Sequence, residues 1–363
     1  DLGGALKRLD QEEADFRAAL RHSLSAQDLT TAGRLIGGLG FLWYAAGQHR
    51  EGLEWCEHLF ALEPDLSDEV LADALHGYAS LLGVAGKPDR AIEVLEQQVE
   101  IRRRLGDPER LGAALNNLGD LYVDVDRYED SERVLAEAIV AFRSCQSYGV
   151  SLTLGTLANG RFNQGRFDEA ERDWRESLAE ARRADHAHSI AVAMVGIGQS
   201  LVASGQAGAA RPILVEARER FQELTVAPGI VDSDIFLGVA ERDLGDPQAA
   251  ARHLLAALSD TGIHWSDDAD FWTLQFAASV ITDRATAAVL LGAVIAAYDR
   301  SDVSQPAFVT QDLDLLRSRL GMELDPEELG RQLRAGGRRT RQEAFDIGRA
   351  SLTEYTAAQG DTS

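Results

Sequence analysis

The residues whose side chains could do chemistry are spread along this chain without a convergent set. His186 and His188 could ligate a metal ion, but no Cys or Glu follows at ligand spacing, and a polar loop is the simpler interpretation. The acidic run at 267–270 lacks the glycine and distal glutamate of a calcium loop and is better explained as an acidic helix start. Ser80 and Ser200 have no nucleophile-elbow context. We therefore expect no enzyme activity, no metal and no cofactor.

The composition excludes several other classes of protein. Of the 363 residues, 45% are hydrophobic, which excludes disorder. No apolar run reaches the roughly 18 residues that a membrane helix needs, so we expect no membrane contact. The net charge of −23 repels phosphate backbones, so we expect no direct nucleic-acid contact by this segment. In the absence of a secretory signal pattern, the expected location is the cytoplasm.

The elements that position these side chains follow from a repeat with a period of about 40 residues. Seven turns are each followed, five residues later, by a small residue in an apolar run. Both series step by 39, 40, 39, 40, 40 and 38 residues, so the register is kept throughout. Such a period is typical of a solenoid of helical pairs. The turns are centred on Gly47, Gly86, Asp126, Gly165, Gly205, Gly245 and Asp283, and the small residues are Gly52, Ala91, Ser131, Ala170, Ala210, Ala250 and Ala288.

The clearest repeat unit lies around the turn at Asp126. Leu115, Leu118 and Tyr122 recur at helical spacing and predict the apolar stripe of a first helix. Gly119 in the middle of that helix predicts the close approach of a neighbouring helix. In the other repeats we expect the core of the second helix to be supplied by Trp55, Leu95, Trp174, Leu214 and Leu254.

Two further features have simple structural explanations. Cys56 and Cys145 fall in different repeats, and we expect buried free thiols rather than a disulfide. A basic cluster near the C-terminus is best explained as a solvated helix face, with an anion-binding or domain-docking patch as the alternative. Its members are Arg331, Arg334, Arg338, Arg339 and Arg341.

The expected domain organisation follows from the extent of the repeats. Residues 1–27 form an N-terminal linking helix, residues 28–300 the repeat array, and residues 301–363 capping helices and a tail. Within these ranges we expect one helix near residues 9–24 and further helices after Gln311. No run of alternating β-branched residues occurs, so the fold class is all-α, with about seven helical pairs in a right-handed superhelix.

The repeat unit resembles the tetratricopeptide family. Leu39-Gly40, Trp43, Gly47 and Pro64 match its pattern, and the segments 9–20 and 287–293 resemble the flanks of the repeats in actinobacterial signal-transducing ATPase regulators of the SARP and LuxR type. That resemblance implies a tetratricopeptide-like solenoid, involved in signal transduction and transcription regulation, that senses or scaffolds. The ATPase and DNA-binding domains would then lie outside this chain, which we expect to be a fragment because it begins with Asp1.

The candidate binding site is one face of the first helices, which in tetratricopeptide arrays lines a concave groove. Polar side chains recur there at matched positions and could hydrogen-bond an extended peptide or a sugar-like ligand. We therefore expect a protein or peptide partner. The alternatives are a receptor that closes on a small effector, or side chains that are merely solvated. The candidate residues are His76, Ser80, Asn116, Asn117, Asp120, Asn159 and Gln199.

Overall fold

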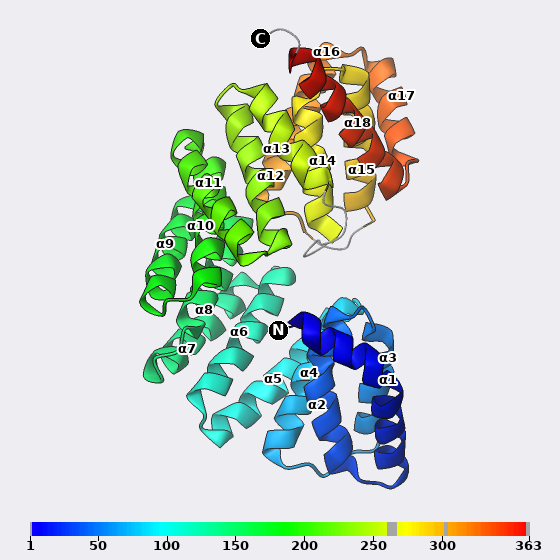
Figure 1. Ribbon diagram of the computed structural model, residues 1–363, viewed down its shortest axis with the longest axis vertical. Coiled ribbons are helices and arrows are strands. Elements are labelled where there is room, and N and C mark those ends of the chain that lie inside the picture. The colour runs from blue at the N-terminus through cyan, green and yellow to red at the C-terminus, as the bar shows by residue number, and fades with distance from the viewer. Residues whose placement is uncertain (1, 260–266, 301–303, 361–363) are drawn as a thin grey trace. The chain divides into compact units, whose positions relative to one another are not determined.

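A computed structural model describes residues 2–259, 267–300 and 304–360 of the chain. Over these ranges the protein forms eighteen α-helices and no β-strand, which confirms the all-α helical-repeat fold (Figure 1). None of the helices in the described ranges is long and apolar enough to cross a membrane. The chain divides into two compact units, residues 1–153 and 154–363.

Unit 1 consists of antiparallel helices that pack on their sequence neighbours. In addition, α2 packs on α4, the first helix of the next repeat. This unit contains α1 (Leu2–Ser25), α2 (Leu29–Ala45), α3 (His49–Ala61), α4 (Asp68–Val84), α5 (Pro88–Leu105), α6 (Pro108–Asp124) and α7 (Tyr128–Ser144). The predicted N-terminal helix is thus present, and it begins earlier than expected.

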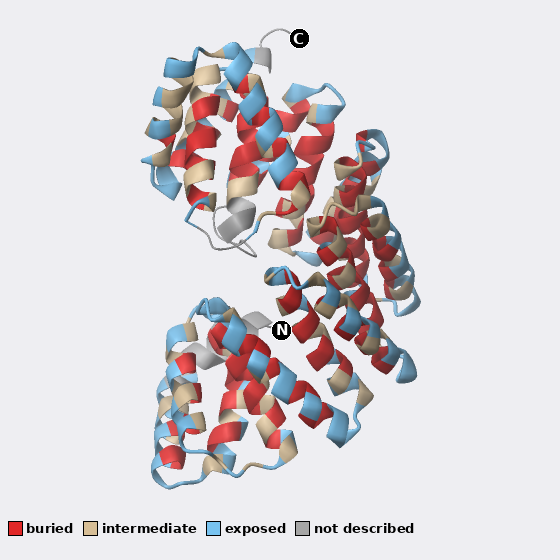
Figure 2. Cartoon of the chain, turned by 180° about the vertical axis from the view of Figure 1, so that it is seen from behind, coloured by how far each residue is buried: buried red, intermediate tan, exposed pale blue. Residues whose placement is uncertain are grey.

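Unit 2 continues the helical pairs and ends in three further helices. Of these, α17 packs on α15 and α18 packs on α13. The helices from the boundary onwards are α8 (Gly149–Asn163), α9 (Phe167–Arg183), α10 (Ala187–Ala203), α11 (Ala207–Leu224), α12 (Ala227–Asp243), α13 (Pro247–Ser259), α14 (Asp267–Val280), α15 (Arg284–Tyr298), α16 (Ala307–Glu323), α17 (Pro326–Gly337) and α18 (Arg341–Gly360). Figure 2 shows the buried residues as stripes along the helices of each unit.

All seven predicted turns join two helices, which confirms the repeat period. At six of them the central residue has a positive φ, for example 69° at Gly47 and 59° at Asp126. A left-handed residue ends a helix and lets the chain reverse, and glycine adopts this conformation without steric cost. The seventh turn differs, because Asp283 has a φ of −70° and caps α15 by accepting a hydrogen bond from the Thr286 amide.

The predicted core of the second helices is confirmed at four positions and wrong at one. Leu95, Trp174, Leu214 and Leu254 are buried. Trp55 is only partly buried, and its Nε1 donates to Glu51 Oε1 at 3.2 Å. The corresponding core position is occupied by Cys56, which is 0% exposed. The first two turns are 39 residues apart, so stepping back from Leu95 by that period gives residue 56 rather than 55.

The prediction of two buried thiols is right for Cys56 and wrong for Cys145. Cys145 is exposed because it follows the last residue of α7, where the helix has already left the core. Its Sγ lies 3.3 Å from Glu109 Oε2. Both cysteines are free thiols.

The C-terminal helices attach through glycines. A Cβ on Gly292 of α15 would lie 2.2 Å from the Leu333 carbonyl oxygen of α17, and one on Gly336 of α17 would lie 1.9 Å from the Val289 carbonyl oxygen. The two backbones can approach this closely only because both positions lack a side chain. This contact fixes α17 against the last repeat.

Candidate functional site

Two neighbouring first helices, α4 and α6, bring part of the predicted polar row together in unit 1. The Asn117 amide nitrogen lies 3.4 Å from His76 Nδ1. The Ser80 hydroxyl donates to the His76 carbonyl oxygen at 3.1 Å, so it is partly engaged within its own helix. All three side chains are half-buried. Of the predicted residues, His76 and Asn117 are thus the pair whose side chains meet between two helices.

The next polar groups along α6 are acidic. Asn116 is half-buried, whereas Asp120 and Asp124 are exposed one helical turn apart. Although both carboxylates reach solvent, the surrounding protein removes enough water to raise the pKa of Asp120, and burial together with the nearby Asp120 charge raises the pKa of Asp124 to about 7. Neither carboxylate forms an ion pair with any residue in the described ranges. This end of α6 thus presents two carboxyl groups without a cationic partner among the described residues, and their raised pKa values mean that a nearby cation would favour their ionised form.

A cleft of about 230 Å³ lies between α4 and α6, with α5 contributing to its lining. It contains two of the predicted residues and several that the sequence analysis did not single out. The lining residues are Asp73, His76, Gln98, Arg102, Arg110, Ala113, Ala114 and Asn117. All of them belong to unit 1.

Ion pairs and burial determine the electrostatics of this cleft. Arg102 is buried and is paired with Asp73. Arg110 also contacts Asp73, at 3.3 Å, and lies 3.0 Å from Glu69. Burial lowers the pKa of His76, and the Arg102 charge lowers it further against the opposing effect of Asp73. His76 therefore favours the neutral form, whose Nδ1 can accept a hydrogen bond from Asn117.

The sequence contains a signal for the α5 part of this cleft that repeat position alone does not identify. Gln98 and Arg102 lie on the same helical face as Leu95 and Val99, all of which are buried. Polar residues at the apolar positions of an amphipathic helix must find partners inside the protein, so they are candidates for a buried polar site. Here Gln98 Nε2 donates to the Ala72 carbonyl oxygen at 3.1 Å.

The remaining predicted residues, Asn159 and Gln199, lie in unit 2. Asn159 is exposed on α8, and Gln199 is half-buried on α10. At positions of α10 and α12 that match Asn116 and Asp120, the side chains are apolar and buried, namely Val195, Ile235 and Val239. The polar row therefore does not continue along unit 2.

In unit 2, α16 lies against the repeats. The Phe308 ring centroid is 6.1 Å from that of Phe162 on α8 and 6.4 Å from that of Phe236 on α12. Arg242 of α12 donates to Asp312 of α16 at 2.6 Å. These contacts hold α16 against α8 and α12, two helices that precede it by more than one repeat. The helix α16 therefore covers part of both.

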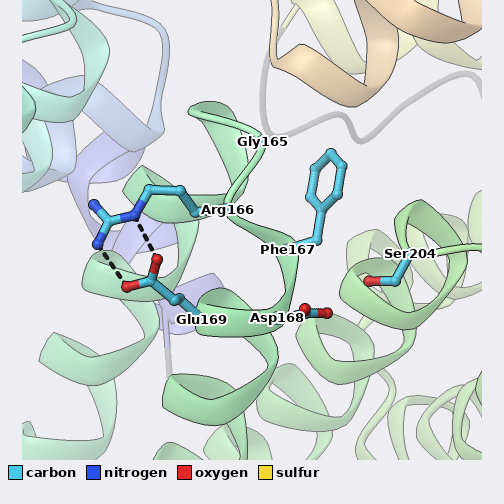
Figure 3. A pocket seen from close by; sticks show the side chains of 6 residues that line it. All are labelled: Gly165, Arg166, Phe167, Asp168, Glu169 and Ser204. Atoms are coloured by element: carbon cyan, nitrogen blue, oxygen red, sulfur yellow. Dashed lines mark hydrogen bonds and ion pairs between the residues drawn. The ribbon is translucent and has the colours of Figure 1, made fainter.

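A second hollow, of about 390 Å³, lies at the turn between α8 and α9 (Figure 3). The Arg166 charge is compensated, because Arg166 forms two hydrogen bonds with Glu169, at 2.9 and 2.6 Å, and Asp168 is the remaining charged residue of the lining. Phe167 packs against Phe162 and Phe308 rather than standing free. The hollow therefore offers no convergent set of functional groups.

The other chemical candidates of the sequence have structural roles. His186 Nδ1 accepts from the Ser189 amide at 3.2 Å and so caps α10. Within the described residues, no group of His, Cys, Asp or Glu is arranged to hold a metal. The acidic run at 267–270 begins α14, but its side chains lie outside the described residues.

The basic cluster extends from α17 to the start of α18, and two of its five arginines form ion pairs. Arg331 pairs with Glu328, and Arg339 lies 3.5 Å from Glu343. Arg341 lies over the Phe345 ring, with its guanidinium carbon 5.4 Å from the centroid. These contacts favour the interpretation as a solvated helix face.

The paired helices form a tetratricopeptide-like array. The family model described as "Tetratricopeptide repeat" matches residues 70–144 and 149–223. The first match contains α4 to α7 and the second contains α8 to α11, so each match covers two helical pairs. A search of curated proteins gives no match to this chain.

Solved structures of similar fold align with most of this chain. The apo form of the quorum sensor NprR from B. thuringiensis has a TM-score of 0.54 at 12% identity and covers 87% of this chain and 96% of its own. A Rap protein complexed with competence and sporulation factor has a TM-score of 0.51 at 14% identity, covering 98% and 99%. BtubC (BKLC) from P. vanneervenii has a TM-score of 0.50 at 18% identity, covering 60% and 92%. Such low identities establish the fold alone.

Proposed function

We propose that this chain is a non-catalytic interaction domain of a cytoplasmic regulator, and that the face of α4 and α6 binds an extended, positively charged segment of a partner protein or peptide. The observation that carries this proposal is the run of polar groups from His76 and Asn117 to Asp120 and Asp124. Extended peptides are recognised through such hydrogen-bonding side chains, and their charge complements the surface that they bind.

The expected charge of the partner follows from the two free carboxylates. Loss of surrounding water is the main cause of the raised pKa of Asp124, and repulsion by the Asp120 charge adds to it. A lysine or arginine side chain next to the two carboxylates would relieve this repulsion. The net charge of −23 also attracts basic partners over a longer range.

Unit 1 is the better candidate for the binding surface. In unit 2 the matched positions are buried and apolar, and α16 contacts α12 through Arg242 and Asp312. Asn159 and Gln199 remain proposed members of the site in unit 2. The proposed domain limits are those expected from the sequence, at 1–27, 28–300 and 301–363.

The role in a regulator is supported by two independent likenesses. The flanks of the repeats resemble those of SARP and LuxR-type signal-transducing ATPase regulators. Two proteins of similar fold are a quorum sensor and a protein solved with a bound factor. We propose on this basis that ligand binding by these repeats controls ATPase and DNA-binding domains elsewhere in a longer protein.

A receptor for a small effector is the alternative function. Pockets for drug-sized ligands usually span about 300–1,000 Å³, whereas the cleft between α4 and α6 measures about 230 Å³. Its size therefore suits one side chain of a peptide better than a complete effector molecule. For this reason we favour the peptide partner.

The experiment is a selection of binding peptides from a random library displayed on phage, with the full chain immobilised. We expect the selected peptides to be enriched in Lys and Arg and to bind more weakly as salt rises, because salt screens exposed charges. Hydrogen exchange in the complex should show protection of α4 and α6. Protection confined to other helices, or selected peptides without basic residues, would contradict the proposal.

A further inference from the structure

Two residues that line the cleft between α4 and α6 each carry a buried polar atom with no hydrogen-bond partner among the described residues. These atoms are Gln98 Oε1 and Arg102 Nη1, and the latter lies 3.8 Å from Glu69 Oε1, within ion-pair range but beyond hydrogen-bond distance. Both residues line the cleft, and they are only 4% and 3% exposed. Buried polar atoms are almost always paired, so an unpaired acceptor and an unpaired donor one helical turn apart need an explanation.

The orientation of the Gln98 amide is fixed by its neighbour. The Gln98 nitrogen donates to the Ala72 carbonyl oxygen at 3.1 Å, and a carbonyl oxygen can only accept. The unpaired atom is therefore the Gln98 oxygen, which needs a donor. Arg102 has the opposite requirement, because a guanidinium can only donate.

The surrounding charges exclude a charged occupant. Arg102 is already paired with Asp73, and Arg110 lies 3.3 Å from the same carboxylate. An entering carboxylate would compete with Asp73 and could not donate to the Gln98 oxygen. An entering ammonium group would be repelled by the Arg102 charge and would leave its Nη1 unpaired. A neutral group that both accepts and donates satisfies both atoms.

An amide has this property, since its oxygen can accept from Arg102 while its nitrogen donates to Gln98. Entry is possible at the rim, where the Asp73 and Arg110 side chains are each 45% exposed. Asn117 forms only a long contact with His76, at 3.4 Å, so it can move aside with little loss.

We propose that this cleft is a subsite for one amide group of the bound segment, supplied by an Asn or Gln side chain or by the peptide main chain. The proposal deepens the proposed function and rests on it, because it names the group that enters beside the acidic end of α6. Arg102 then acts as the donor and Gln98 as the acceptor, and together they bind a neutral amide in preference to the corresponding carboxylate.

The test uses three probes that share the same main-chain amides: the N-acetyl, N-methylamide derivatives of glutamine, glutamate and norvaline. The ¹⁵N-labelled full chain is titrated with each probe while the side-chain NMR signals of Gln98 and Arg102 are followed. A response to the glutamine probe alone identifies a side-chain amide, and an equal response to all three identifies the main-chain amide. No response to any probe, or a response to the glutamate probe alone, overturns the proposal.

A variant of the acceptor provides the second measurement. Gln98→Met keeps the length of the side chain but removes its oxygen, and Gln97→Met on the exposed side of α5 is the matched control. We expect the affinity for the responding probe to fall roughly fivefold or more in Gln98→Met only. Equal affinities in the two variants overturn the proposal, and so does a larger loss in the control. If Gln98→Met does not fold, the three titrations of the unaltered chain decide.

The two proposals fail in different ways. Selected peptides that protect α4 and α6 without any response of Gln98 and Arg102 to the probes would contradict the subsite alone. A probe response without peptide binding to this face would contradict the proposed function and leave the amide subsite in place.

Discussion

Gly119 and Leu135 lie so close together that a Cβ on Gly119 would be 2.4 Å from Leu135 Cδ2. The same relationship recurs between Gly198 and Leu214, also at 2.4 Å, and a similar one brings Gly238 to within 2.6 Å of Leu254. In each case a leucine of the second helix fills the space that a side chain on the first helix would take. This contact sets how closely the two helices of a repeat can pack.

Replacing this glycine should destabilise the protein. Gly119→Ala forces Leu135 to move within a packed core, and overpacking of this kind costs about 1–3 kcal/mol. Gly83→Ala is the matched control, because Gly83 also lies in a first helix and a Cβ there meets nothing within 4 Å. Urea unfolding should show a loss for Gly119→Ala only. Equal stabilities of the two variants would mean that the close contact is not a constraint.

Trp174 is buried between two first helices of unit 2. A Cβ on Gly196 would lie 2.1 Å from its ring, and one on Gly155 would lie 2.8 Å from it. Trp174→Ala should therefore leave a cavity and cost roughly 3–5 kcal/mol. Trp55→Ala, which removes a partly buried tryptophan, should cost less.

The position of that loss along the chain is a further expectation. The stability of a repeat depends mainly on its contacts with the neighbouring repeats. The rate of hydrogen exchange in Trp174→Ala should therefore rise most in α8 to α11 and least in the terminal helices. A uniform rise over the whole chain would indicate that the repeats unfold as one cooperative unit.

The two cysteines should differ in their reaction with a thiol reagent. Cys145 is exposed, whereas Cys56 is buried and burial raises the pKa of its thiol. The thiolate is the reactive form, so Cys56 should react only when unit 1 opens. Mass spectrometry after labelling of the native protein should find the label on Cys145. Equal labelling of both thiols without denaturant would contradict the burial of Cys56.

Stability should depend on pH through His76. Its pKa is lowered in the folded protein, chiefly by burial, so the folded state favours the neutral ring. The stability that the neutral His76 ring contributes is fully present above the ordinary pKa of about 6.5. It is lost as the pH falls through the lowered pKa of the folded protein. Between about pH 7.5 and 5.5, His76→Gln should therefore lose less stability than the unaltered chain. His58→Gln, at an exposed position, is the control for the removal of a histidine.

The sequence was sufficient to predict the repeats but not every core position. The turns at Gly47 to Gly245 were predictable because a left-handed residue is needed at a fixed distance from the next helix. Assignment of Trp55 to the core failed because a one-residue change of register moves a side chain through about 100° around a helix. Cys145 was misplaced for a related reason, since the pattern does not show where a helix ends.

The site was harder to predict than the fold. His76 and Asn117 were found by repeat position, and the structure brings them into contact. Arg102 and Gln98 were missed, because their partners come from α4 and the ion pair with Asp73 spans two helices. The packing of α16 on unit 2 could not be inferred from the sequence, because α16 does not follow the repeat pattern that relates the other helices.

The affinity of a selected basic peptide for the double variant Asn116→Ala, Asp120→Asn tests the central claim most directly. Calorimetry should show a loss of roughly tenfold or more, because one neutral and one charged interaction are removed. Folding should be kept within about 1 kcal/mol, since neither side chain belongs to the core. Glu129→Gln, which removes an exposed charge on α7, should bind as the unaltered chain does. Unchanged affinity in a folded double variant would contradict the account and place the binding surface away from this face of α6.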